Sequence, residues 1–134
     1  MIVYLSGINS LEKEFKSGRL DPSPLYALES FYCIKPWEYD LLQDFKGVML
    51  DSGAFSVIAG TAKRSLDYWE DYVKKYIAFI NRTKINTFVE LDIDDAVGMT
   101  NVERFRKMIE DEPRMEVRAL VTKYPQGSER QLIY

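Results

Sequence analysis

The residues best suited to chemistry are aspartates that directly follow apolar runs. Residues 48–50 lead into Asp51, and residues 88–91 lead into Asp92. If both runs are buried strands of a parallel sheet, both aspartates lie at its carboxyl edge, where ligands bind in βα architectures. A carboxylate at the end of a buried strand is costly to place unless it binds something. Asp51 and Asp92 are therefore candidate ligand-binding residues.

The loop after Asp51 has a composition that suits a flat ligand. Gly53 and Gly60 allow the backbone to approach a ligand closely, and Phe55 supplies a flat apolar face. Carboxylates accept ring N–H donors and backbone amides donate to a ring carbonyl, so the segment favours a planar heterocycle. The alternative interpretation is a common Asp-Ser-Gly turn, in which Asp51 only caps a short helix.

The other polar residues are weaker candidates for a functional site than Asp51 and Asp92. Asp94 and Asp95 are typical of a solvated turn or a helix cap, and their spacing lacks the glycine and distal glutamate of a calcium loop, so no metal site is expected. Lys63 and Arg64 either touch a phosphate or form plain surface.

The chain has no histidine, so proton transfer depends on carboxylates, tyrosine, lysine or water. Cys33, the one cysteine, is expected to be a buried small hydrophobe and excludes an intrachain disulfide.

Strands and helices alternate in the expected secondary structure. The predicted strands are 2–5, 31–34, 48–51, 87–92 and 115–121. The predicted helices begin at or just after Asn9, Ser23, Pro36, Ser65 and Thr100. The helix after Ser65 carries one apolar stripe at helical spacing, which is typical of core packing: Leu66, Trp69, Val73, Tyr76, Ile77 and Ile80. Crossovers of this length imply parallel pairing, and the fold class is therefore α/β with parallel βα units.

Composition limits the class of protein. The 134 residues suit one domain spanning 1–134, and 46% hydrophobic residues are enough for a core. A net charge of -3 argues against a nonspecific nucleic-acid binder, which needs surplus Lys and Arg to displace counterions. No segment has the roughly 18 apolar residues of a membrane span, and the first residues do not resemble a signal peptide, so a cytoplasmic protein is expected.

The loop resembles a known signature. Residues 50–56, Leu-Asp-Ser-Gly-Ala-Phe-Ser, are similar to the Asp-Ser-Gly-Gly-Phe-Gln signature of queuine and archaeosine tRNA-guanine transglycosylases. They are more similar still to the Asp-Ser-Gly-Ala-Phe-Ser form of transglycosylase-like proteins tied to 7-deazaguanine insertion into DNA. Asp92 falls where that family has its second base-binding aspartate. The likeness covers residues 46–121 in layout, and only the seven-residue loop is specific.

The resemblance implies a fold, an activity and site residues. The fold is a TIM (β/α)8 barrel that exchanges guanine for a 7-deazaguanine in tRNA or DNA through a covalent glycosyl-enzyme intermediate, without a cofactor. Asp51 would be catalytic, contacting the base and moving its proton. Ser52, Gly53 and Phe55 would shape the substrate pocket, and Asp92 would bind the amino and ring N–H edge of the base.

The chain departs from that family in two ways. Ala54 and Ser56 replace the glycine and glutamine of the tRNA enzymes, which indicates a different pocket or substrate. A whole barrel needs about 250 residues, so 134 residues correspond to the N-terminal half of a barrel, without the nucleophilic aspartate and zinc-binding cysteines of the back half. The chain is then a fragment, a truncated product, or a half-barrel that forms a homodimer. A catalytically inactive binding or assembly module, and a hydrolase or lyase on an unrelated βα fold, stay open as alternatives.

Overall fold

One sheet forms the centre of the molecule. The computed structural model describes residues 1–60, 63–111, 119–121 and 132–133, and the side chains of those up to residue 111. Parallel pairs join β1 to β5 in chain order, and β6 pairs antiparallel with β5. The strands are β1 (Tyr4–Leu5), β2 (Tyr26–Ser30), β3 (Gly47–Asp51), β4 (Thr87–Val89), β5 (Ala119–Val121) and β6 (Leu132–Ile133). The α/β class with parallel βα units is confirmed; the antiparallel β6 was not predicted.

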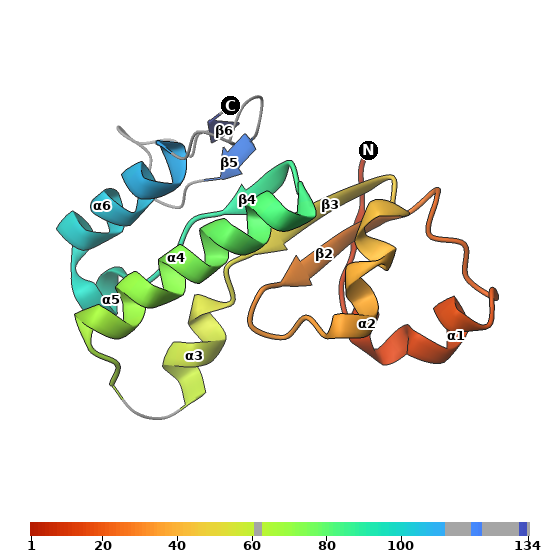
Figure 1. Ribbon diagram of the computed structural model, residues 1–134, viewed down its shortest axis with the longest axis horizontal. Coiled ribbons are helices and arrows are strands. Elements are labelled where there is room, and N and C mark those ends of the chain that lie inside the picture. Colours follow the sequence, from red (N-terminus) through yellow and green to blue (C-terminus); the bar gives the residue numbers. More distant parts are fainter. Residues whose placement is uncertain (61–62, 112–118, 122–131, 134) are drawn as a thin grey trace.

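Helices follow most of the strands, as βα units require (Figure 1). The longest, α4, begins after Ser65, where the sequence predicted a helix start, and the Ser65 side chain accepts a hydrogen bond from the Tyr68 N–H. The helical segments are η1 (Ile8–Leu11), α1 (Glu12–Lys16), α2 (Pro36–Tyr39), η2 (Leu41–Gln43), α3 (Ala54–Gly60), α4 (Leu66–Thr83), α5 (Asp94–Val97) and α6 (Met99–Glu110).

The second βα unit differs from the prediction. Residues 31–34 form a turn rather than a strand, and no helix follows Ser23. The strand is β2 instead, although its Tyr-Ala-Leu-Glu-Ser sequence contains three good helix formers. All five of its residues are in register with β3, and this pairing outweighs local propensity. Glu29 therefore lies on a central strand of the sheet, between β1 and β3.

Three smaller expectations are also wrong. Cys33 is exposed rather than buried, because it lies in the turn after β2. Leu66 is 40% exposed, although the helical stripe that follows it is buried. Gly98, rather than Thr100, precedes α6, and it provides no side-chain cap. The predicted strand residues 115–118 lie outside the described residues.

The sheet has one covered face and one open face. Ala27, Leu50 and Phe88 are at most 2% exposed and pack into core clusters with the helices. Their neighbours Leu28 and Met49 are paired in register, are half-buried, and belong to neither cluster of the described residues. We call the side that carries Leu28 and Met49 the open face.

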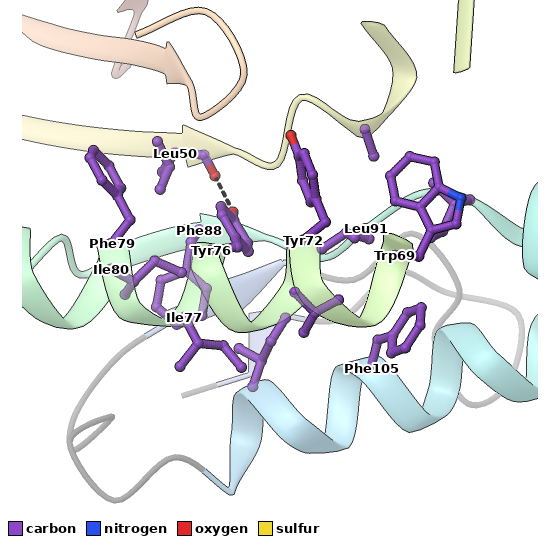
Figure 2. Close-up of a cluster of buried hydrophobic side chains, with 14 of the residues drawn as sticks. Leu50, Trp69, Tyr72, Tyr76, Ile77, Phe79, Ile80, Phe88, Leu91 and Phe105 are labelled. Carbon is purple, nitrogen blue, oxygen red and sulfur yellow. Dashed lines mark hydrogen bonds between the residues drawn. The ribbon is translucent and has the colours of Figure 1, made fainter. Parts of the chain in front are cut away.

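Helix α4 ties the core to the strand ends (Figure 2). Tyr76 is fully buried, and its hydroxyl lies 3.1 Å from the Leu50 carbonyl oxygen and 2.7 Å from that of Val89. One hydroxyl hydrogen is thus shared between carbonyls of two adjacent strands. One turn earlier, the Tyr72 hydroxyl donates to the Ser52 carbonyl oxygen at 2.6 Å. Both contacts hold the carboxyl ends of β3 and β4 in place.

Candidate functional site

A cleft opens at the carboxyl edge of the sheet. The strands β2 and β3 run toward the same edge, with α3 and α5 beyond it (Figure 1). The cleft measures about 260 Å³. The described residues that line it are Ser6, Gly7, Ile8 and Asn9 after β1, Leu28, Glu29 and Ser30 of β2, Cys33 and Ile34 of the following turn, Glu38 of α2, and Asp51 of β3. This position agrees with the rule that parallel βα sheets bind ligands at strand ends.

Asp51 is the predicted site residue that the structure places in the cleft. It is the last residue of β3, in register with Ser30 of β2, and its side chain is half-buried. Burial raises the pKa of its carboxyl, hydrogen bonds from the backbone N–H groups of Ser52 and Gly53 lower this pKa, and the nearby Asp92 carboxylate raises it further. Asp51 and Asp92 are therefore close enough to interact electrostatically.

Gly53 lets the loop after β3 pass close to the end of β2. Its φ is +73°, in the left-handed region. A Cβ atom built on it would lie 2.5 Å from the Tyr32 Cβ, 2.7 Å from the Ser30 Oγ and 2.8 Å from the Tyr32 backbone nitrogen. No side chain fits there without movement of the backbone. The glycine thus acts through backbone packing, which sets the position of Asp51.

The other predicted site residues lie outside the cleft lining. Ser52 is buried, and its Oγ accepts a hydrogen bond from the Ala54 N–H at 3.3 Å. Asp92 is half-buried just after β4. Phe55 is 72% exposed on α3 and is not among the described lining residues. The structure brings Asp51 and Asp92 near each other and leaves Phe55 apart.

A carboxyl pair in the cleft escaped the sequence analysis. Glu29 is 4% exposed and Glu38 is 1% exposed, and they share a hydrogen bond. Burial, that bond and the negative charge of Glu38 raise the pKa of Glu29 to about 8, from 4.5. The pair was missed because Glu29 was not placed on a strand. An available signal was the helix start at Pro36 with a glutamate two residues later, whose Oε2 accepts from the Lys35 N–H at 2.8 Å.

A second buried acid has a structural partner instead. Glu90, 1% exposed just after β4, accepts two hydrogen bonds from the Arg106 guanidinium of α6, at 2.7 and 3.2 Å. The bidentate geometry satisfies the carboxylate and fixes α6 to the sheet. Glu90 therefore belongs to the fold rather than to the cleft.

The remaining polar residues that the sequence suggested lie in a helix turn or on the surface. Asp94 and Asp95 form the first turn of α5. Lys63 and Arg64 are exposed, and the Arg64 guanidinium lies over the Tyr68 ring at 4.8 Å. Within the described ranges, no group of three or more His, Cys, Asp or Glu side chains could hold a metal ion.

Comparisons with protein-family models, with curated proteins and with solved structures find no match to this chain. No helix in the described part of the chain is both long and apolar enough to cross a membrane.

Proposed function

We propose that the cleft binds a purine-type base and that the chain is the base-binding half of a base-exchange glycosyltransferase. The observation that carries the proposal is the position of Asp51: a partly desolvated carboxyl at a strand end, in a cleft, with Asp92 nearby. In this proposal a guanine is replaced by a 7-deazaguanine in tRNA or DNA, as the resemblance of residues 50–56 implies. The N-terminal half of a TIM barrel is the fold proposed with it.

The chemistry assigned to Asp51 follows from its surroundings. An ionised carboxylate accepts N–H donors of a ring edge, and the Asp92 carboxylate accepts from a neighbouring donor. Burial and Asp92 both raise the pKa of Asp51, which brings it closer to the range in which a carboxyl takes up and returns a proton. Ser52 and Gly53 orient the carboxylate through their N–H groups. No described residue is assigned as the nucleophile.

Calorimetry with guanine and 7-deazaguanine tests the proposal. Asp51→Asn keeps the shape of the side chain and replaces an acceptor oxygen by a donor, so binding should weaken at least about tenfold. Asp92→Asn should weaken it as well. Asp67→Asn, at an exposed position in the first turn of α4, is the matched control and should bind like the original chain. Equal binding by Asp51→Asn and the control would refute the assignment, as would the absence of binding by the folded original chain.

The open face supports a second candidate function, an assembly module without catalysis. Leu28 and Met49 lie on this face outside both core clusters of the described residues. A second copy of the chain, packed against the same face, would cover both residues and produce a symmetric homodimer. The two candidates differ in what they require: the enzyme requires Asp51, and the module requires the open face.

A further inference from the structure

The cleft contains a second polar centre, the Glu29–Glu38 pair, which the proposed base chemistry does not use. Oε1 of each carboxyl is buried, and neither receives a hydrogen bond from any described group other than the one that the two carboxyls share. Buried acceptors ordinarily have donors, because a buried acceptor without one has lost its hydrogen bonds to water and gained none in return. The pair therefore has unused capacity for N–H donors.

The electrostatics of the cleft select the kind of donor. Three carboxyl groups line it, from Glu29, Glu38 and Asp51, and no lysine or arginine is among the described lining residues. The other titratable group of the lining is Cys33, in the turn before α2, while the segment after β1 contributes the uncharged Ser6 and Asn9. Such a lining attracts cations and repels anions.

The volume and the geometry limit the ligand further. About 260 Å³ is several times the roughly 30 Å³ that one water occupies, so a small organic group fits. A planar amidinium or guanidinium carries several N–H donors in one plane, so it can donate to two neighbouring carboxyls at the same time. A compact ammonium has no such planar fork.

We propose that the Glu29–Glu38 pair is a binding site for a planar nitrogen cation of the amidinium or guanidinium class, which takes the place of the proton that the two carboxyls share. The proton passes to the solvent as the cation enters, so the total charge of pair plus occupant is unchanged. The desolvation of the cation and of the newly ionised carboxylate is offset by their mutual attraction and by the N–H hydrogen bonds between them. This inference does not depend on purine binding at Asp51.

Titration calorimetry with methylguanidinium tests the inference on the full chain. Runs in two buffers of different ionisation enthalpy give the number of protons released per ligand. We expect close to one proton at pH 7 and a value falling toward zero above pH 9, where the shared proton has already left. N-methylurea, which has a similar shape and no charge, should bind at least about tenfold more weakly. No proton release at pH 7, or equal binding of the two compounds, would overturn the inference.

Substitutions test whether the released proton comes from the Glu29–Glu38 pair. Glu29→Gln removes the acid that holds the proton and should abolish proton release, whereas Glu103→Gln at an exposed position of α6 should not. Glu38→Gln leaves Glu29 buried and removes the second carboxylate, so it should weaken methylguanidinium binding at least about tenfold. Proton release that persists in folded Glu29→Gln, or unchanged affinity in folded Glu38→Gln, places the ligand elsewhere and rejects the site. If either variant does not fold, the inference is tested by two measurements on the original chain: the number of protons released per methylguanidinium, and the difference in affinity between methylguanidinium and N-methylurea.

Asp51→Asn should impair purine binding and, because it removes one of the three carboxyls of the lining, should also weaken methylguanidinium binding. Each cation that binds should still release one proton, because the Glu29–Glu38 pair is intact, and this proton count separates the two sites.

Discussion

At the scale of residues, the molecule depends on a few groups held in unfavourable states. Glu29 is a carboxyl buried beside another carboxyl, which raises its pKa to about 8. Gly53 is held at a positive φ between two strand ends. Both are at the carboxyl edge of the sheet. Stability and the shape of the cleft therefore depend on the same few residues.

The stability of the chain should fall between pH 5 and pH 9 because of Glu29. Its pKa is 4.5 in the unfolded chain and about 8 in the folded one, so the folded state binds more protons in this window. Binding more protons in the folded state means that stability decreases as pH rises, by on the order of a few kcal/mol in all. Urea unfolding at pH 6 and pH 9 measures the loss, and Glu29→Gln should remove most of it. A chain equally stable at both pH values contradicts the buried pair.

Gly53→Ala should be far more harmful than alanine at another positive-φ glycine. At Gly53 the new methyl would meet the Tyr32 backbone, so we expect a loss of roughly 2–4 kcal/mol from strain and overpacking. Gly18 also has a positive φ, +77°, but nothing lies within 4 Å of its added Cβ. Gly18→Ala is therefore the matched control and should cost only about 1 kcal/mol. Thermal unfolding of the two variants compares these costs, and similar losses would show that the close approach at Gly53 is relieved cheaply.

At the scale of elements, helices α4 and α6 hold the strand ends by polar contacts as well as by apolar packing. Tyr76 of α4 bonds to carbonyl oxygens of β3 and β4 residues, and Arg106 of α6 bonds to Glu90 after β4. Because each contact joins a helix to a strand end, the helices set the spacing between Asp51 and Asp92. The site is thus positioned from the covered face of the sheet.

Breaking the Glu90–Arg106 pair from its two sides should have unequal costs. Arg106→Met leaves the carboxylate of Glu90, 1% exposed, without its cation, and should cost about 3–5 kcal/mol. Glu90→Gln leaves an arginine whose side chain is 11% exposed and can turn toward water, so its cost should be smaller. The double variant should recover part of the loss of Arg106→Met. Urea unfolding of all three variants completes the cycle, and strictly additive costs would show that the pair does not act as a unit.

At the scale of the whole molecule, the described residues cover one side of the sheet. The helices and the two core clusters cover the face of Ala27, Leu50 and Phe88, whereas the open face carries half-buried Leu28 and Met49. In a closed barrel the second face is covered by the other strands of the barrel. Sequential parallel order is compatible with such closure and with a pairing of two copies.

If the chain is an assembly module, its dimer should depend on the open face. Met49→Glu places a charge on this face and should shift sedimentation from dimer to monomer, with at least about a hundredfold weaker association. Ile58→Glu, at a 39% exposed position on α3, is the control and should leave the dimer intact. A compact monomer at all concentrations of the original chain would reject the assembly function.

Much of this protein was predictable from local sequence patterns. The apolar stripe of α4 and its Ser65 cap, the strand β3, and the position of Asp51 at the end of that strand all follow from periodicity and turn residues, because these features involve neighbours in the chain. The α/β class with parallel strands followed from the alternation of such elements. These predictions are confirmed by the described residues.

Tertiary structure alone decided the rest. The segment 26–30 has helix-forming residues and became a strand because β3 offered five residues of parallel pairing, a contact between segments about twenty residues apart. That choice buried Glu29 against Glu38 and raised its pKa, which the residues next to Glu29 in the chain do not indicate. It likewise left Cys33 exposed in the turn after β2. Local propensities differ by less than about 1 kcal/mol per residue, whereas burial and strand pairing act over whole elements and therefore prevail.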